Sequence, residues 1–382
     1  MSVLIQKKDL LDLMQKAFPL IPTKSSLQIL SNFKISYIDS KLEISATDLD
    51  HSMKVFAPAE GEAPFDITVN ARKIFEIVRE LPDGIVSMEI DETVLILESE
   101  RGFSCKIAGA DSQDFPGFPE NDSDNSFHIK SSSICEIISK SSFAVAKDES
   151  RAALCGILWE IFSDKTGMVS TDGHRLGSSF LNVNLPVEDG ISGILSPRSV
   201  SSLSRILNAK SEDMIDVILG DKYVTFQSPD FIMCSKLIEG TYPDYTKVIP
   251  KNNPKEAVVD RVMLLNAVKR VSVLSNQKTH LVKFTFKNGM VEIVVLNREI
   301  GGEARDSIPI EYEGDDHVVG FNGQYFTEIL DIIETPKIRI EMNTQISACL
   351  LFPVYEKEEE QKKSDDLFLI MPLRIMEEVL AT

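Results

Sequence analysis

The sequence predicts an α+β protein of three repeated domains, each with two helices packed against antiparallel strands. A length of 382 residues allows two to four domains at roughly 100–200 residues each. A pattern of strand, amphipathic helix and β hairpin recurs with a period near one third of the chain, which indicates repeated domains and not a solenoid. Polar, turn-rich segments at 121–125 and 250–254 separate the copies. We therefore expect domains at 1–124, 125–254 and 255–382.

Each copy opens with a short strand followed by an amphipathic helix. The strands are expected at 2–5, 126–129 and 257–259, and the helices at 6–17, 130–141 and 259–270. Apolar residues recur at spacings of three and four in all three helices, as Leu10, Leu13 and Met14 do in the first. This spacing predicts one apolar stripe on each helix, which packs on a sheet.

Two alternating β runs follow each opening helix and predict a hairpin. The paired runs are 33–37 with 42–45, 156–162 with 168–170, and 281–286 with 291–296. Asn288-Gly289 is the strongest turn signal, because this dipeptide favours the tight loop of a two-residue hairpin. A second strand and helix complete each copy, at 65–69 with 70–80, 193–195 with 197–210, and 317–320 with 323–334. Thr47-Asp48 and Thr171-Asp172 occupy matching points of the first two copies.

The charge of the chain is unevenly distributed. Acidic residues outnumber basic residues by 59 to 40, which gives a net charge of −19. A uniformly acidic surface would argue against nucleic acid, because Lys and Arg supply the contacts to phosphate. The predicted helices are nevertheless net basic, except for the acidic one at 323–334. Equivalent basic helices would form a surface that contacts phosphates without reading the base sequence. Aromatic residues do not alternate with these basic positions, so stacking on the bases of single strands is not expected.

Composition argues against several other classes of protein. The sequence contains no run of about 18 apolar residues, so no membrane span is expected. The first residues also lack the apolar stretch of a signal peptide. The five cysteines are scattered and form no C-x-x-C pair, so neither a disulfide framework nor a zinc site is expected. We expect a reduced, cytoplasmic protein. The charged run at 356–366 is interpreted as a solvated hairpin loop.

Motifs of catalysis are missing, so we expect no catalytic residues, no metal and no cofactor. The sequence has no phosphate-binding loop, dinucleotide fingerprint, zincin helix or nucleophile elbow. Asp172 beside His174 leaves an acid–base pair of a hydrolase open, and the alternative is a turn or a binding role. Asp48 and Asp50 leave a metal pair open in the same way, with a structural turn as the alternative.

Ten short motifs occur in order along nearly the whole chain. They lie at 46–49, 70–74 with 79–84, 114–116, 148–151 with 154–156, 170–176, 235–240, 242–245 with 248–250, 274–276, 321–325 and 371–375. Together with the threefold repeat, these motifs resemble the bacterial DNA polymerase III β-subunit family, the sliding clamps. The resemblance implies the DNA clamp fold, in which two chains join head to tail into a ring of six domains with pseudo-sixfold symmetry.

The resemblance also implies a function. A sliding clamp is a non-catalytic processivity factor that encircles duplex DNA as a homodimer, slides on it and tethers its partners. The implied partners are double-stranded DNA, the DNA polymerase III alpha subunit, the clamp loader delta subunit, and other polymerases and repair proteins, with no membrane. The implied location is the cytoplasm, at the nucleoid. A clamp-fold scaffold that binds proteins without encircling DNA is the open alternative.

Site residues carry over from the family residue by residue. The implied peptide pocket comprises Leu154, Thr171, Gly173, His174, Arg175, Leu176, Pro243, Val248, Ile346, Met371, Pro372, Leu373 and Arg374. The implied DNA contacts are Lys24, Arg72, Lys73, Arg79, Arg151 and Arg198. The implied ring interface joins Phe103 and Cys105 of one chain to Val273 and Leu274 of the next.

Three features depart from the family pattern. Lys247 stands where the pocket often has arginine, and Cys105 replaces a more usual aliphatic residue at the ring interface. Residues 376–382 continue beyond the Met-Pro-x-Arg-x segment at which the family commonly ends. The first two features predict a different pocket rim and a looser ring closure, and the third places extra residues beside the pocket.

Overall fold

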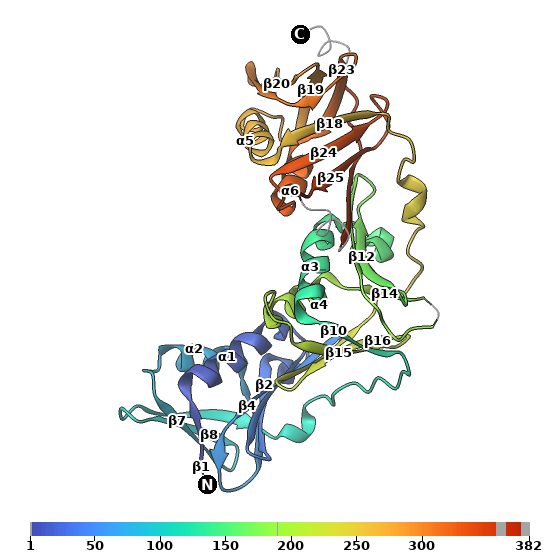
Figure 1. Cartoon of the computed structure of the whole chain (residues 1–382). Helices are drawn as coiled ribbons and strands as arrows, with labels where there is room; N and C mark the ends of the chain where they lie inside the picture. Colours follow the sequence, from blue (N-terminus) through green and yellow to red (C-terminus); the bar gives the residue numbers. More distant parts are fainter. Residues whose placement is uncertain (1, 189, 357–363, 376–382) are drawn as a thin grey trace. The chain divides into compact units, whose positions relative to one another are not determined.

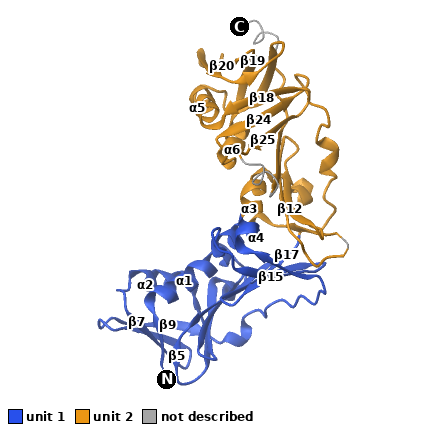
Figure 2. Cartoon of the chain, in the orientation of Figure 1, with its two compact units in different colours: residues 1–135, 198–237 blue, residues 136–197, 238–382 orange. Residues whose placement is uncertain are grey.

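The computed structural model describes residues 2–188, 190–356 and 364–375, so the segment 376–382 and most of the charged run at 356–366 lie outside it (Figure 1). The chain forms two compact units, residues 1–135 with 198–237 and residues 136–197 with 238–382 (Figure 2). The division runs through the second predicted domain, because each of the two largest sheets joins strands from neighbouring copies of the repeat.

The first unit is built on a 13-stranded sheet in the order β10-β15-β16-β17-β4-β3-β2-β6-β9-β8-β7-β1-β5. The first copy supplies β1 (Ser2–Gln6), β2 (Asn32–Ile38), β3 (Lys41–Thr47), β4 (His51–Pro58), β5 (Glu60–Gly61), β6 (Phe65–Asn70), β7 (Ile85–Asp91), β8 (Val94–Ser99) and β9 (Ser104–Ala110). The second copy supplies β10 (Ser126–Lys130), β15 (Met214–Leu219), β16 (Tyr223–Ser228) and β17 (Phe231–Lys236). The copies meet where β17 pairs antiparallel with β4, with Ser235 opposite His51.

The second unit contains a nine-stranded sheet and a four-stranded sheet, with orders β14-β11-β12-β13-β26-β25-β24-β18-β22 and β21-β20-β19-β23. The second copy supplies β11 (Ile157–Ile161), β12 (Lys165–Thr171), β13 (Arg175–Asn182) and β14 (Ile191–Leu195). The third copy supplies β18 (Lys255–Asp260), β19 (Leu281–Lys287), β20 (Met290–Asn297), β21 (Gly302–Pro309), β22 (Glu311–Tyr312), β23 (His317–Asn322), β24 (Lys337–Met342), β25 (Cys349–Val354) and β26 (Ser364–Ile370). Here the copies meet where β13 pairs with β26, with Arg175 opposite Ile370.

The six predicted helices are confirmed, with small shifts at their ends. They are α1 (Lys7–Ala17), α2 (Ala71–Glu80), α3 (Ser131–Ser141), α4 (Pro197–Ile206), α5 (Arg261–Ser272) and α6 (Gly323–Ile332). Leu10, Leu13 and Met14 of α1 are buried as the spacing predicts. The helix predicted at 259–270 begins two residues later, because the Asp260 carboxylate accepts the Met263 N–H and caps it. No helix in the described part of the chain has the length and apolarity to cross a membrane.

The predicted hairpins form with their turns in the expected places, and the backbone conformations of these turns differ from one another. Asn288-Gly289 does connect β19 to β20, yet Gly289 is the member of that pair with a positive φ, at 77°. The turn with two positive φ values joins β2 to β3 instead, at Asp39 (50°) and Ser40 (60°). Two positive φ values match the twist of the flanking strands, and aspartate tolerates this region better than most residues.

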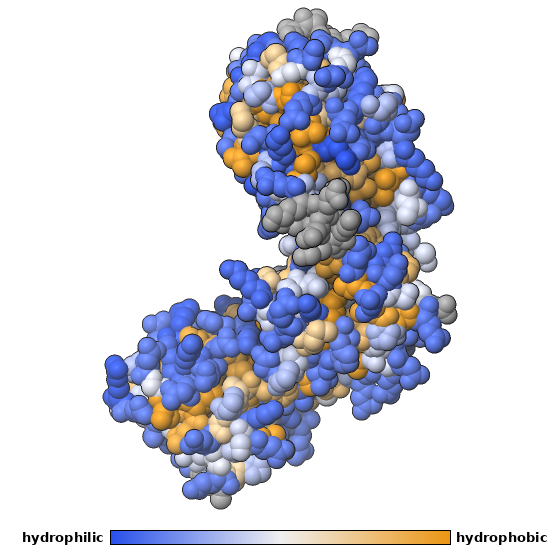
Figure 3. All heavy atoms as spheres, viewed as in Figure 1, coloured by the Kyte–Doolittle hydropathy of each residue, from blue (hydrophilic) through white to orange (hydrophobic). Residues whose placement is uncertain are grey.

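The apolar side chains are gathered between helices and sheets, and the exterior is largely polar. In the third copy, Phe284, Phe321 and Phe326 form one aromatic cluster, with ring centroids 4.9–5.4 Å apart. On the face shown in Figure 3, hydrophilic residues cover most of the surface and hydrophobic residues lie in patches between them. A polar exterior of this kind agrees with the net charge of −19.

Candidate functional site

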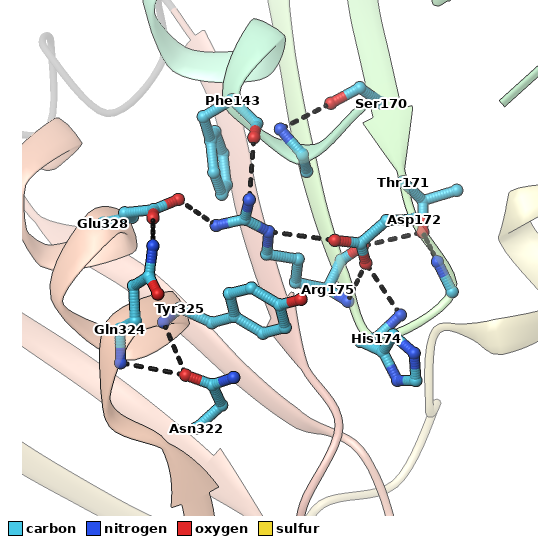
Figure 4. Close-up of polar contacts among 12 residues, drawn as sticks. Phe143, Ser170, Thr171, Asp172, His174, Arg175, Asn322, Gln324, Tyr325 and Glu328 are labelled. Carbon is cyan, nitrogen blue, oxygen red and sulfur yellow. Dashed lines mark hydrogen bonds and ion pairs between the residues drawn. The ribbon is translucent and has the colours of Figure 1, made fainter. Parts of the chain in front are cut away.

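The turn between β12 and β13 carries the motif that the sequence singled out, and hydrogen bonds fix it (Figure 4). The Asp172 carboxylate accepts the backbone N–H groups of His174 at 2.9 Å and of Arg175 at 3.0 Å. The Thr171 hydroxyl accepts the Gly173 N–H and donates to the Arg175 carbonyl at 2.7 Å. Gly173 adopts φ +88°, which favours glycine. Asp172 therefore shapes a turn and holds the backbone of His174, which supports the turn interpretation over the acid–base pair.

Arg175 follows this turn, and its side chain is buried. Its Nε donates to Asp172 Oδ2 at 3.2 Å, and its Nη2 donates to the Phe143 carbonyl at 3.0 Å. Its Nη1 forms an ion pair with Glu328 of α6 (Figure 4). The guanidinium also lies over the ring of Tyr325, 4.2 Å from its centroid. All of these groups belong to the second compact unit.

A cavity of about 600 Å³ adjoins the turn. It is lined by His174, Asn276, Lys278, Thr279, Leu281, Leu296, Asn297, Arg298, Glu299, Asn322, Tyr325, Met371, Pro372, Leu373 and Arg374. The lining therefore contains five residues of the predicted pocket and ten that sequence reasoning missed. The signal for some of them was present, because Asn276, Asn322 and Tyr325 lie in motifs that carried the family resemblance.

The segment 371–374 is held in place as one wall of this cavity. The Met371 N–H donates to the His174 carbonyl and the Leu373 N–H donates to the Gly320 carbonyl, both at 2.8 Å. Leu373 thereby forms an isolated antiparallel bridge with β23. A Cβ on Gly320 would come within 3.0 Å of the Leu373 oxygen, so glycine allows this close approach.

The other predicted pocket residues lie outside the lining of the 600 Å³ cavity. Leu154 and Leu176 are buried, and Leu176 belongs to the apolar core of the nine-stranded sheet. Val248 and Ile346 are exposed, by 53% and 72%. Burial raises the pKa of the Tyr242 phenol, which stays neutral, and its oxygen accepts the Thr171 N–H at 3.2 Å. The residue before Pro243 thus supports the start of the turn.

The predicted DNA-contact residues are all exposed, but two of them also have partners within the chain. Arg79 pairs with Glu80 at 3.1 Å. Arg198 pairs with Asp48 and donates to the Pro19 carbonyl at 2.9 Å. The exposed members of the set are Lys24, Arg72, Lys73, Arg79, Arg151 and Arg198. Arg198 is therefore engaged in holding the first unit together as well as being exposed.

Several other basic helix residues are paired with carboxylates. Lys140 contacts Asp366 at 2.7 Å, Lys269 contacts Asp331 at 3.0 Å and Arg270 contacts Asp306 at 2.7 Å. Pairing of this kind neutralises much of the positive charge that the sequence places on α3 and α5. The basic surface expected from counting charges is therefore weaker on these two helices than the count suggests.

Asp48 occupies a structural turn and not a metal pair. Its carboxylate accepts the N–H groups of Asp50 at 3.1 Å and His51 at 2.7 Å. Burial opposes its ionisation, but hydrogen bonds from His51 and the charge of Arg198 hold the pKa of Asp48 below its ordinary value. Across the described residues, no cluster of three or more His, Cys, Asp and Glu side chains is arranged to hold a metal ion.

The predicted ring-interface residues include exposed apolar side chains. Phe103 precedes β9 and is 42% exposed, whereas Cys105 is partly buried. Val273 follows α5 and is 80% exposed, and Leu274 beside it is half-buried. Ile300, which the sequence did not single out, is 64% exposed in the turn before β21. Exposed apolar side chains of this size are common at protein–protein contacts.

Comparison with known proteins covers nearly the whole chain. Family models for the N-terminal, central and C-terminal domains of the DNA polymerase III beta subunit match residues 1–119, 128–244 and 246–366. A beta sliding clamp of Pseudomonas putida KT2440 is 30% identical over 380 residues, covering 98% of this chain and all of that protein. One of Bacillus subtilis strain 168 is 26% identical over 350 residues, covering 89% of this chain and 92% of that protein.

Solved structures agree with these sequence matches. The DNA polymerase III subunit beta from Pseudomonas aeruginosa superposes with a TM-score of 0.91 at 29% identity, covering 98% of this chain and 100% of that one. A sliding clamp from Bacillus subtilis gives a TM-score of 0.89 at 25% identity, with 98% and 99% covered. On the match of all three domains in order, the chain belongs to the DNA polymerase III β-subunit family, the sliding clamps, which are non-catalytic processivity factors of DNA replication.

Proposed function

We propose that this chain closes into a head-to-tail dimeric ring around duplex DNA and tethers replication proteins through the cavity beside the turn at 171–175. The observation that supports the ring is that strand pairs join neighbouring repeats, while among the described pairings one strand of the first repeat and one of the third have no partner from a neighbouring repeat. The repeat boundaries near 124 and 254 belong to this proposal, with three domains in each chain.

The internal repeat shows which strands are equivalent in the three copies, and therefore which strand edges correspond. At the first joint β4 pairs with β17, and at the second β13 pairs with β26. The corresponding strand of the third copy is β21, which stands at the edge of its four-stranded sheet. The strand of the first copy that corresponds to β17 and β26 is β9, whose outer edge pairs with β6 at Gly109 and Ala110 among the described pairings.

These two edges fit each other in a second copy of the chain. An unpaired strand edge offers a row of N–H and C=O groups that a further strand satisfies. Each chain has one edge of each kind, so head-to-tail pairing closes a ring when the rotation permits it. Phe103 and Cys105 lie beside and in the start of β9. The side chains of Leu274 and Ile300 approach Gly302 at the start of β21, and Val273 precedes Leu274, so apolar side chains would flank the new strand pair.

The proposed DNA contacts are weak and independent of sequence. Lys24, Arg72 and Lys73 are exposed, and a chain with net charge −19 is a poor candidate for tight phosphate binding. Retention by topology, with scattered phosphate contacts, would let a ring slide. Processivity then follows from the tether, because a bound polymerase stays at high effective concentration near its template. The place of action is the cytoplasm, at the nucleoid.

The proposed partner site is the cavity with its neighbouring exposed residues. A volume of about 600 Å³ falls within the roughly 300–1,000 Å³ typical of ligand pockets. Leu281, Leu296, Met371 and Tyr325 supply apolar walls, suited to Leu and Phe anchors of a short peptide. The proposed carriers of such peptides are the alpha subunit of DNA polymerase III, the delta subunit of the clamp loader, other polymerases and repair proteins.

Reversing two charges on α2 tests the proposed DNA contact. The double variant Arg72→Glu with Arg79→Glu should lower clamp-loader-dependent loading onto nicked circular DNA by roughly tenfold, because two phosphate contacts become repulsive. Lys41→Glu with Lys222→Glu, at exposed hairpin positions, makes the same change in net charge and should load normally. Light scattering should give an unchanged mass for both. Normal loading of the Arg72 and Arg79 variant would show that these side chains do not face DNA.

A further inference from the structure

Two arginines were carried over as walls of the peptide pocket, and their environments differ. Arg374 is exposed and lines the cavity. The Arg175 side chain is 7% exposed and lies outside the cavity lining. An arginine that is almost fully buried offers little surface to a peptide. Its role must therefore be sought in the groups that it contacts.

The contacts of Arg175 come from three different parts of the second unit. Asp172 belongs to the turn between β12 and β13, Phe143 lies just beyond α3, and Glu328 and Tyr325 belong to α6 (Figure 4). Charged hydrogen bonds reach Asp172 and Glu328, and a neutral carbonyl, that of Phe143, takes a third. The rings of Phe143 and Tyr325 lie 5.2 and 4.2 Å from the guanidinium. A planar guanidinium can satisfy all of these groups at once, whereas an ammonium cannot.

The hydrogen-bond network around Arg175 reaches cavity-lining residues at both of its ends. At one end, the Asp172 carboxylate holds the His174 N–H, and the His174 carbonyl in turn accepts the Met371 N–H. At the other end, Tyr325 presents its ring to Arg175 and also lines the cavity. Gln324 donates to Glu328 at 3.0 Å, and the Asn322 side chain caps α6, so the α6 end is itself held. Arg175 thus links the turn to α6, and each of these two elements contributes a residue to the cavity lining.

The first copy of the repeat contains a related link. Asp48 occupies the position of Asp172, and its carboxylate pairs with Arg198 at the start of α4. In the first copy the arginine comes from the helix of the next repeat, and in the second it comes from the turn and reaches a glutamate on the helix of the next repeat. Each of the two joints between repeats is therefore bridged by an arginine and the turn aspartate, but the arginine has a different origin at each joint.

We propose that Arg175 is a positioning residue for partner binding: it holds the 171–174 turn and α6 at the separation that shapes the cavity, without touching the partner peptide. This inference rests on the proposed function, because it assumes that the cavity receives a peptide. It assigns the arginine a different role from that of a pocket wall. The expected consequence of removing it is a weaker peptide site in a chain that still folds and still forms its ring.

The test compares two arginines that stack on rings and pair with carboxylates. Arg175→Met removes the proposed bridge, and Arg339→Met removes a guanidinium that stacks on Phe352 and pairs with Glu341 outside the cavity lining. Binding of a fluorescein-labelled peptide Ala-Leu-Ser-Leu-Phe is measured by anisotropy at 10 °C, with the mass of each variant checked by light scattering. We expect Arg175→Met to weaken binding at least tenfold and Arg339→Met to stay within twofold of the unaltered chain.

A second variant separates positioning from general loss of stability. Glu328→Gln keeps the size of the side chain and an acceptor but removes its charge, and it should weaken binding about threefold. Adding it to Arg175→Met should cause no further loss, because the bridge is already gone. If Arg175→Met does not fold, the Glu328→Gln value decides alone, and binding within error of the unaltered chain overturns the proposal.

Hydrogen exchange gives a readout that is independent of the peptide. The backbone amides at positions 174, 175 and 371 should exchange faster in Arg175→Met and at the normal rate in Arg339→Met. Unaltered peptide binding in Arg175→Met, or equal weakening in both arginine variants, would overturn the positioning role while leaving the proposed function standing. No binding of the peptide by the unaltered chain would overturn the proposed function, and the positioning role with it.

Discussion

Replacing Val273 with aspartate should convert the dimeric ring into single chains. Val273 is 80% exposed in the chain described here, so the substitution leaves the folded core untouched. In the proposed ring its side chain faces the region of Phe103 and Cys105 of the next chain. Burying an unpaired carboxylate in such an apolar contact costs several kcal/mol, which exceeds what a small apolar patch contributes. Light scattering should then report 42.6 kDa, the mass of one chain, and not twice that value.

The control for this variant is a second exposed valine. Val262 on α5 is 47% exposed, and Val262→Asp makes the same chemical change away from the proposed interface. It should keep the doubled mass. The thermal unfolding temperature of Val262→Asp should match that of the unaltered dimer, whereas Val273→Asp should unfold as a single chain. A doubled mass for Val273→Asp at micromolar concentration would place the ring contact elsewhere on the chain.

Deleting residues 371–382 should abolish the stimulation of a replicative polymerase. Met371, Pro372, Leu373 and Arg374 line the cavity, and two backbone hydrogen bonds seat them against the 171–175 turn and β23. Removal of this wall opens the cavity and takes away its apolar anchor surface. Stimulation of DNA synthesis on a primed circle should fall at least tenfold, to the level seen without clamp, while light scattering still reports the dimer.

A shorter deletion is the matched control. Removing 376–382 leaves in place every cavity-lining residue of the described part of the chain, so stimulation should persist. Comparison of the two deletions isolates the contribution of 371–375. If the variant that lacks 371–382 stimulates the polymerase as well as the unaltered chain does, its partners bind somewhere other than this cavity.

Much of the fold could be predicted because local patterns determine it. The apolar spacing in α1 and the β runs around Asn288-Gly289 each depend on neighbouring residues, and both elements form where expected. Helix ends were less predictable, because caps such as Asp260 compete with the first apolar residue of the pattern. The turn between the runs at 33–37 and 42–45 was expected, but the positive φ values of Asp39 and Ser40 were not, since neither residue is the glycine that signals such a conformation.

The site could be predicted only in part because it depends on tertiary contacts. His174 and 371–374 were found through family motifs, but Lys278, Leu296 and Glu299 join the cavity because the fold brings segments distant in sequence together. Sequence spacing also cannot show that Arg175 is buried or that Lys269 is paired with Asp331. Long-range ion pairs of this kind decide which charges remain on the surface. The charge count predicts a basic surface, and the pairing revises it.

The most direct test of a closed ring around DNA is retention on DNA after loading by a clamp loader. The protein is loaded onto nicked circular DNA, and its retention is measured before and after a restriction enzyme linearises the circle. A ring held by topology stays on the circle and slides off the linear form, which is the result expected for this protein. Equal retention on both forms would indicate ordinary affinity binding, and absence from both would favour a scaffold that binds proteins without encircling DNA.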